Sequence, residues 1–371
     1  MTSLSKKALV ILLLLILFAH QVTRAEAAKG IPGSPAFGFG VSLYPNGPML
    51  DQALKLLNDL RPDWLYVPVS WAAASPAADT QPDLAVLDQV MAAAAQWKIA
   101  VVLSVSDAPA WAQTPQGPDP RLAAQFAALL VQRYSGTLQA LELFPRANTL
   151  TGWGSAPNPK SYLALYRAVQ NGIAESGADL LLVAAGMQPL GPGQQDPAIA
   201  MDDLVFLQGL YDAGGKDMLK VISLQYTDMH ADLLLSPLEN KGMLFRHYET
   251  VRALMLANGH IDGLLWITGF GLPSGSHGQT RVNAQDLDQQ QEWLQQGYYQ
   301  LLSQLYIGTA VMQSLNPPPT ESAIRAASIL QSDQSLHPFY QSLYRMTRAN
   351  NEELSFQKPG RAKEGRLAKN R

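Results

Sequence analysis

Three carboxylate side chains lie in or directly after apolar segments, where acid–base chemistry is often placed. Glu142 lies within one such segment, and Asp107 and Asp228 each follow another. Glu142 stands four residues before Arg146, so it could also be a buried, layer-filling residue that pairs with this arginine. Asp107 and Asp228 have the alternative role of capping or bracing loops. The three residues are therefore fallback candidates for catalysis.

Aromatic side chains follow five of the apolar segments. An aromatic face offers apolar area together with a polar handle, which suits stacking against a sugar ring. We predict a ligand-binding rim in which Arg146 and Asn148 supply polar contacts, since a guanidinium can bind hydroxyls or a carboxylate. Taken singly, each aromatic residue could instead pack in the core or a loop. The five are Tyr44, Trp71, Trp111, Trp153 and Tyr226.

The elements that must position these residues alternate regularly. Apolar segments that read as strands alternate with amphipathic segments that read as helices, and parallel βαβ units of this kind close into a barrel when there are eight. We therefore predict an α/β protein with a single (β/α)8 (TIM) barrel. The predicted strands are 36–43, 64–70, 99–105, 138–144, 180–185, 221–224, 264–268 and 305–311. The predicted helices are 51–60, 83–97, 121–134, 158–174, 202–213, 241–257, 286–303, 320–331 and 338–346.

The two ends of the chain differ from this middle part. Lys6 and Lys7 precede an apolar run, and small residues follow near Ala27, which is the layout of a secretory signal peptide. We predict a signal peptide over 1–28, the barrel over 29–348 and a basic, disordered tail over 349–371. The protein would then be secreted, or anchored to a membrane if the signal segment is not cleaved. The tail could make weak contact with a membrane or cell wall.

Composition excludes several function classes. The net charge is −3, which argues against general nucleic-acid binding. There is no cysteine, and the six histidines show no H-E-x-x-H or clustered spacing, so we predict no metal and no cofactor. No G-x-S-x-G element accompanies the serines. These observations argue against nucleic-acid binding, metal-dependent chemistry and a serine hydrolase of the G-x-S-x-G type.

Two stretches resemble the clan A glycoside hydrolases, retaining (β/α)8 enzymes of families such as 5 and 39. Their fourth strand reads roughly E-x-W-N-E-P-N, followed by a tryptophan and P-N-P-x-x-Y. Here it reads Glu142-Leu-Phe-Pro-Arg-Ala-Asn148, then Trp153, then Pro157-Asn-Pro-Lys-Ser-Tyr162. Their seventh strand ends in a pattern like W-x-T-E-F-G, which here is Trp266-Ile-Thr-Gly-Phe-Gly271.

The resemblance implies that both catalytic positions are substituted. The family's acid/base glutamate falls on Arg146, and its nucleophile falls on Gly269, which has no side chain to form a glycosyl-enzyme bond. Retaining hydrolysis needs two carboxyl groups about 5–5.5 Å apart and inverting hydrolysis about 6.5–9.5 Å. An active enzyme would therefore have to use Glu142, Asp107 or Asp228.

We predict an exported, catalytically inactive barrel that binds an oligo- or polysaccharide; the resemblance implies a β-linked one. One alternative is a diverged glycosidase with relocated carboxylates. Another is a structural surface barrel without a specific ligand, which would be favoured if Trp71 and Trp111 were buried.

Overall fold

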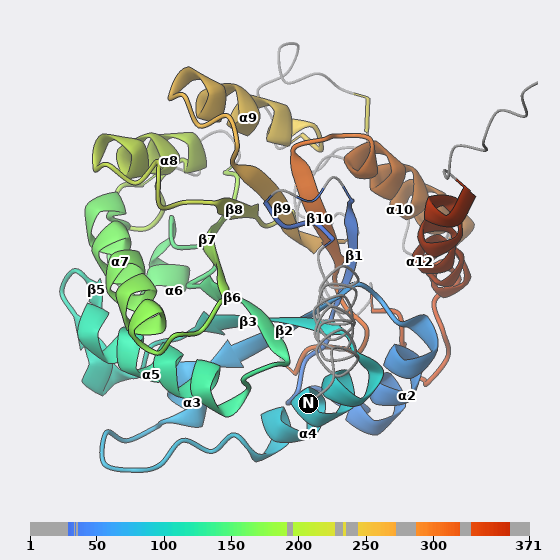
Figure 1. Ribbon diagram of the computed structural model, residues 1–371, viewed down its shortest axis with the longest axis horizontal. Helices are drawn as coiled ribbons and strands as arrows, with labels where there is room; N and C mark the ends of the chain where they lie inside the picture. The colour runs from blue at the N-terminus through green and yellow to red at the C-terminus, as the bar shows by residue number, and fades with distance from the viewer. Residues whose placement is uncertain are drawn as a thin grey trace, which may run out of the picture.

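The computed structural model describes residues 29–32, 34, 36–190, 196–226, 233–234, 244–271, 287–319 and 328–356. Eight parallel strands close into a barrel in the order β1-β10-β9-β8-β7-β6-β3-β2. Helices surround the barrel in Figure 1. The predicted (β/α)8 fold is therefore confirmed. The strands are β1 (Gly38–Ser42), β2 (Trp64–Ser70), β3 (Ala100–Ser106), β6 (Leu138–Leu143), β7 (Leu181–Met187), β8 (Val221–Leu224), β9 (Leu264–Phe270) and β10 (Ile307–Met312).

The strands form where apolar residues run without interruption. In β3 the residues from Val101 to Val105 are all buried, because one face of the strand lines the barrel and the other is covered by helices. Strands that are buried on both faces read as continuous apolar runs rather than alternating ones. This is why the eight strands could be located from sequence.

The helices begin at recognisable capping residues. The side chain of Asp119 accepts hydrogen bonds from two main-chain N–H groups at the start of α5. Asn158 accepts one from Ser161 at the start of α7. Pro120 and Pro159 occupy the first helical positions, where no N–H is needed. The helices are α2 (Leu50–Leu60), α3 (Trp71–Ala74), α4 (Ala85–Trp97), α5 (Pro120–Arg133), α6 (Leu150–Trp153), α7 (Pro159–Glu175), α8 (Asp203–Asp212), α9 (His247–Ala257), α10 (Leu287–Leu302) and α12 (Phe339–Phe356).

The C-terminal region differs from the prediction. Of the predicted helix 320–331, the described residues 328–331 are not helical. The main-chain N–H groups of Ile329 and Leu330 bond to the carbonyls of Ser314 and Leu315, so tertiary pairing holds this segment extended. Helix α12 continues to Phe356, past the predicted end of the barrel at 348.

The lower end of the barrel, where the strands begin, is closed by the segment that precedes β1. The indole N–H of Trp64 donates to the carbonyl of Lys29 at 2.9 Å, and that of Trp266 donates to the carbonyl of Gly30 at 2.8 Å. The two indole rings lie 4.8 Å apart inside the barrel. Active sites of such barrels lie at the upper end, where the strands finish, so the candidate catalytic residues are expected there.

Within the described residues, no helix combines the length and apolar character that crossing a membrane requires.

Candidate functional site

A buried cluster of five polar side chains lies inside the barrel toward its upper end. We call it the polar layer, and its central residue is Glu142, which is fully buried. Each of the other four carries a hydroxyl that reaches the Glu142 carboxylate from a different strand. The members are Tyr66 on β2, Ser104 on β3, Glu142 on β6, Ser223 on β8 and Thr268 on β9.

The four hydroxyls divide evenly between the two carboxylate oxygens. Oε2 of Glu142 accepts from Tyr66 and Ser104, each at 2.6 Å. Oε1 accepts from Ser223 at 2.5 Å and from Thr268 at 3.2 Å. A buried carboxylate is stable only when its oxygens are hydrogen-bonded, and here both are.

Tyr66 keeps its proton in this setting. The pKa of Tyr66 lies far above its ordinary value of 10.0. The largest cause is burial, followed by the negative charge of Glu142 and the hydrogen bond to it. The phenol therefore keeps its proton and donates a hydrogen bond to Glu142. No ion pair joins Glu142 to Arg146, so the hydroxyls, rather than the predicted arginine, satisfy this carboxylate.

Strand β9 carries a bulge where Gly269 lies. Ile267 pairs with Ala310 and Phe270 with Met312, so two residues of β9, Thr268 and Gly269, stand opposite one residue of β10. Bulges are frequent next to functional sites because they re-aim side chains. A methyl group added at Gly269 would meet Gln225 and Tyr226 at 3.5 Å, which is ordinary contact.

Strand β7 carries a second bulge, and there the glycine is required. Gly186 has a φ of +44°, and an added methyl group would lie 2.8 Å from the main chain of Pro145 and 3.0 Å from the Glu142 carboxylate. Its N–H donates to the Ser223 hydroxyl at 2.8 Å. Gly186 therefore packs directly against the polar layer.

The two glycines give a matched pair of predictions. We expect Gly269→Ala to change the free energy of unfolding by less than about 1 kcal/mol, and Gly186→Ala to reduce it by about 2 kcal/mol or more, because only the second adds both backbone strain and a clash. Urea denaturation of both variants would measure this. Equal costs at the two positions would contradict the described bulge geometry.

Left-handed backbone conformations gather at the upper ends of three adjacent strands. The φ angles are +52° at Asp107 after β3, +50° at Phe144 and +62° at Arg146 after β6, and +71° and +44° at Ala185 and Gly186 in β7. Non-glycine residues held in this way cost about 1–3 kcal/mol each and cluster at functional sites. The strain marks this part of the rim as the candidate site.

Arg146 lies in this strained part of the rim and is half-buried. Its main-chain N–H donates to the carbonyl of Gly186 at 2.8 Å, which fixes the loop. Within the described residues, its guanidinium makes no hydrogen bond or ion pair. A guanidinium offers five hydrogen-bond donors and no acceptor, so this side chain can donate to a ligand but cannot take the place of a catalytic carboxylate.

Asn148 is buried and braces the rim from below. Its amide accepts from the N–H of Gln188 at 2.9 Å and donates to the carbonyls of Gln188 and Met201 at 2.8 and 2.9 Å. These bonds join the loop after β6 to the segment after β7. Asn148 therefore braces these two segments, and its predicted contact with a ligand stays a prediction.

Three of the five predicted rim aromatics are buried. Trp71 is 1% exposed and stacks on Phe126 of α5 at 5.2 Å. Trp153 is 1% exposed, and its indole N–H donates to the carbonyl of Gln116 at 2.9 Å. Tyr226 is also 1% exposed and packs against Phe245. Helices and loops cover these three rings, so they support the rim instead of facing a ligand.

Tyr44 and Trp111 are partly exposed. The Asn316 side chain binds both main-chain polar groups of Tyr44 at 3.0 Å, which holds this residue at the end of β1. Gln313 donates to the Tyr44 hydroxyl at 3.4 Å. The indole N–H of Trp111 donates to the carbonyl of Ser75 at 3.0 Å and leaves part of the ring open.

Of the other two carboxylates predicted as fallback catalysts, the structure describes Asp107 but not Asp228. Asp107 is exposed at the rim and accepts a hydrogen bond from Ser106 at 3.1 Å. Its carbonyl accepts from the N–H of Ala72, so the residue also braces the loop after β2. Asp228 lies outside the described residues. No group of three metal-ligating side chains is present in the part of the chain that the structure describes.

Sequence reasoning did not identify Tyr66, Ser104, Ser223 and Thr268 as partners of Glu142. A signal was present, because each is a hydroxyl residue in an otherwise apolar strand. Gln313 and Asn316, which position Tyr44, were also missed. They follow the eighth strand and could have been found by asking which polar residues succeed each strand.

One charged pair links the starts of α8 and α9. The imidazole of His247 lies 2.7 Å from the carboxylate of Asp203, which is 1% exposed. Burial alone would lower the pKa of His247, but the charge and hydrogen bond of Asp203, with Asp202, raise it above 6.5. The stabilising charged pair is therefore complete below the unfolded histidine pKa of 6.5 and is lost as the pH rises through the folded pKa.

We expect Asp203→Asn to destabilise the protein more at mildly acidic than at mildly alkaline pH. The cause is that the variant removes the partner that keeps His247 charged. Denaturant titrations of both proteins across this pH window would measure the difference. A penalty independent of pH would show that the pair does not titrate as the geometry indicates.

No protein-family model and no functionally curated protein matches the sequence. The fold does match solved structures. A family 39 glycoside hydrolase from Bacteroides cellulosilyticus WH2 has a TM-score of 0.62 and 18% identity, and the match covers 83% of this chain and 63% of that one. The chain thus spans less than two thirds of that enzyme's length.

Two further structures support the same comparison. A glucosidase from Croceicoccus marinus has a TM-score of 0.61 and 13% identity over 86% of this chain and 70% of its own. An endo-β-1,4-glucanase from Xanthomonas axonopodis pv. citri has a TM-score of 0.54 and 13% identity over 85% of this chain and 99% of its own. The protein therefore has the barrel fold of the clan A glycoside hydrolases.

Proposed function

We propose that the protein is a carbohydrate-binding barrel that does not hydrolyse glycosidic bonds by double displacement. The observation that carries this proposal is the state of Glu142. Its carboxylate lies inside the barrel, is fully buried, and accepts hydrogen bonds from four hydroxyls on its two oxygens. A nucleophile or acid/base catalyst must instead present an oxygen to the substrate.

The two positions that the resemblance assigns to catalysis support the same proposal. Arg146 carries no carboxyl group to act as acid/base, and Gly269 has no side chain to act as nucleophile. Gly269 stands in a strand bulge, the kind of feature that re-aims side chains at a site. Neither of these two described positions therefore offers a carboxylate for the pair that retaining hydrolysis uses.

The binding surface that we propose consists of Arg146, Tyr44 and Trp111. All three are partly exposed and follow strands at the upper end of the barrel. The arginine offers five donors to sugar hydroxyls or to the carboxylate of an acidic sugar, and the two rings offer stacking faces. Trp71, Trp153, Tyr226 and Asn148 would then hold this surface in place.

Two alternatives have an observation in their favour. Asp107 is exposed on a strained part of the rim, which favours a diverged glycosidase that uses it. The burial of Trp71 favours a structural barrel, although Trp111 remains partly open.

We also propose that residues 1–28 are an export signal or anchor, which would place the barrel outside the cytoplasm.

The binding proposal is tested by calorimetric titration with β-1,4-gluco-, β-1,3-gluco- and β-1,4-manno-oligosaccharides, and with oligouronides as acidic probes. We expect at least one probe to bind saturably. Tyr44→Ala and Trp111→Ala should weaken binding, whereas Val205→Ala, on the surface of α8, should not. Absence of binding by every probe would favour the structural barrel.

A further inference from the structure

Exposed apolar side chains gather at the lower end of the barrel, opposite the candidate site. They stand at the end of α9 and on the loops before β9 and β10. We call them the lower patch: Leu256, Ile261 and Leu305, which are 49%, 66% and 95% exposed.

Arg252 ties the lower patch together. It donates to the carbonyl of Ile261 at 2.7 Å, and its guanidinium stacks over the ring of Tyr306, which follows Leu305, at 5.2 Å. Leu256 lies one helical turn after Arg252 and therefore on the same face of α9. The three apolar side chains are thus held near one point.

Charged residues surround this point. His260, next to Ile261, has a pKa below its ordinary value. The largest cause is burial, and the positive charges nearby lower the pKa further: they belong to Arg252, Lys220 and Lys216. The negative charge of Asp217 acts in the opposite direction. The exposed Asp262 adds a second acid. Apolar side chains among cations are typical of surfaces that enter the headgroup region of a bilayer.

The segment before β1 reaches the barrel beside the lower patch. Gly30 contacts Gly308, which is three residues after Leu305, and Gly30 also accepts the hydrogen bond from Trp266. Residues 1–28, with the apolar run that begins at Ala8, precede this point. In the sequence, this apolar run therefore precedes the segment that packs at the lower end of the barrel.

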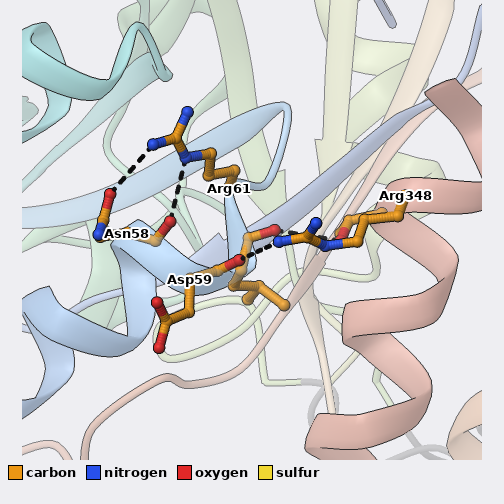
Figure 2. A pocket seen from close by; sticks show the side chains of 6 residues that line it. Asn58, Asp59, Arg61 and Arg348 are labelled. Atoms are coloured by element: carbon orange, nitrogen blue, oxygen red, sulfur yellow. Dashed lines mark hydrogen bonds between the residues drawn. The ribbon is translucent and has the colours of Figure 1, made fainter.

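Helix α12 also reaches the lower end of the barrel. In α12, Thr347 donates to the carbonyl of Leu60 at 3.1 Å and Arg348 donates to that of Asp59 at 3.2 Å, at the lower end of α2. Figure 2 shows Arg348 and Arg61 in a hollow of about 360 Å³ there. The sequence beyond α12 contains Lys358, Arg361, Lys363, Arg366, Lys369 and Arg371, and one acid, Glu364.

We propose that the lower end of the barrel faces a lipid bilayer. The lower patch enters the headgroup region, and the basic sequence beyond α12 supplies positive charge that attracts anionic lipid. The upper end, with Arg146, then opens away from the membrane. This proposal does not depend on carbohydrate binding.

The chain has no cysteine, so single-cysteine variants of the full chain can carry one polarity-sensitive fluorophore each. The test positions are Leu305→Cys and Ile261→Cys. Val205→Cys, which is 58% exposed at the start of α8 and near the upper end, is the matched control. Each protein is mixed with vesicles of phosphatidylcholine and phosphatidylglycerol that contain a lipid-borne quencher.

We expect quenching and a blue shift at 305 and 261 and neither at 205. A further Arg252→Ala substitution should reduce the effect at 261, because it releases the loop that presents Ile261. Equal quenching at 205 and 305, or no quenching at any position, would overturn the proposal. A response to soluble dextran sulfate but not to vesicles would also overturn it and would indicate an anionic polymer as the partner.

Discussion

Replacement of Glu142 by leucine is expected to lower the free energy of unfolding by about 3–4 kcal/mol. The substitution leaves the hydroxyls of Tyr66, Ser104, Ser223 and Thr268 without the acceptor that all four share. Each buried donor left unsatisfied costs about 1–3 kcal/mol, and the pair Tyr66 and Ser104, 2.7 Å apart, can recover part of this by bonding to each other. Denaturant unfolding followed by tryptophan fluorescence would give the value.

Glu142→Gln is the matched variant for this experiment. It keeps the side-chain shape and one acceptor oxygen, and the serine and threonine hydroxyls can turn to accept from its amide. We expect it to cost clearly less than leucine. If both variants were as stable as the native protein, Glu142 would not be the centre of a satisfied polar layer, and its burial would need another explanation.

Replacement of Arg146 by alanine is expected to weaken binding of an oligosaccharide that binds the native protein by about ten- to a hundredfold. This corresponds to the loss of charge-assisted hydrogen bonds worth about 1.5–3 kcal/mol. Stability should change little, because the described side chain makes no hydrogen bond or ion pair. Calorimetric titration of both proteins with the same sugar would measure the change.

Arg121→Ala is a suitable control, since Arg121 is an exposed arginine on α5. Arg146→Lys tests geometry, because lysine keeps the charge but cannot form the planar, forked contact of a guanidinium. Unchanged affinity in the alanine variant would remove Arg146 from the proposed binding surface.

The sequence was sufficient to predict the barrel because its strands are continuous apolar runs between amphipathic helices. Burial of Glu142 was one of the two readings that the sequence left open. Its partners could not be predicted, because hydroxyls as far apart in sequence as Tyr66 and Thr268 meet only through the closure of the sheet. The short C-terminal segment 328–331 was misread as helix because its main-chain pairing with Ser314 and Leu315 is tertiary.

The exposure of the aromatic residues at the candidate site could not be predicted from the sequence. Position after a strand places a ring near the upper end of the barrel but does not say what covers it. Phe126 of α5 covers Trp71, whereas Trp111 in the next loop stays partly open. The difference depends on how each helix packs on its neighbours, which the pattern of a single segment does not contain.

The most direct test of the account is product analysis by mass spectrometry after long incubation of the purified protein with the oligosaccharide panel, alongside binding to the same sugars. We predict intact sugars throughout and saturable binding of at least one of them. Cleaved products that disappear in Glu142→Gln or Asp107→Asn would contradict this and establish an enzyme with relocated carboxylates.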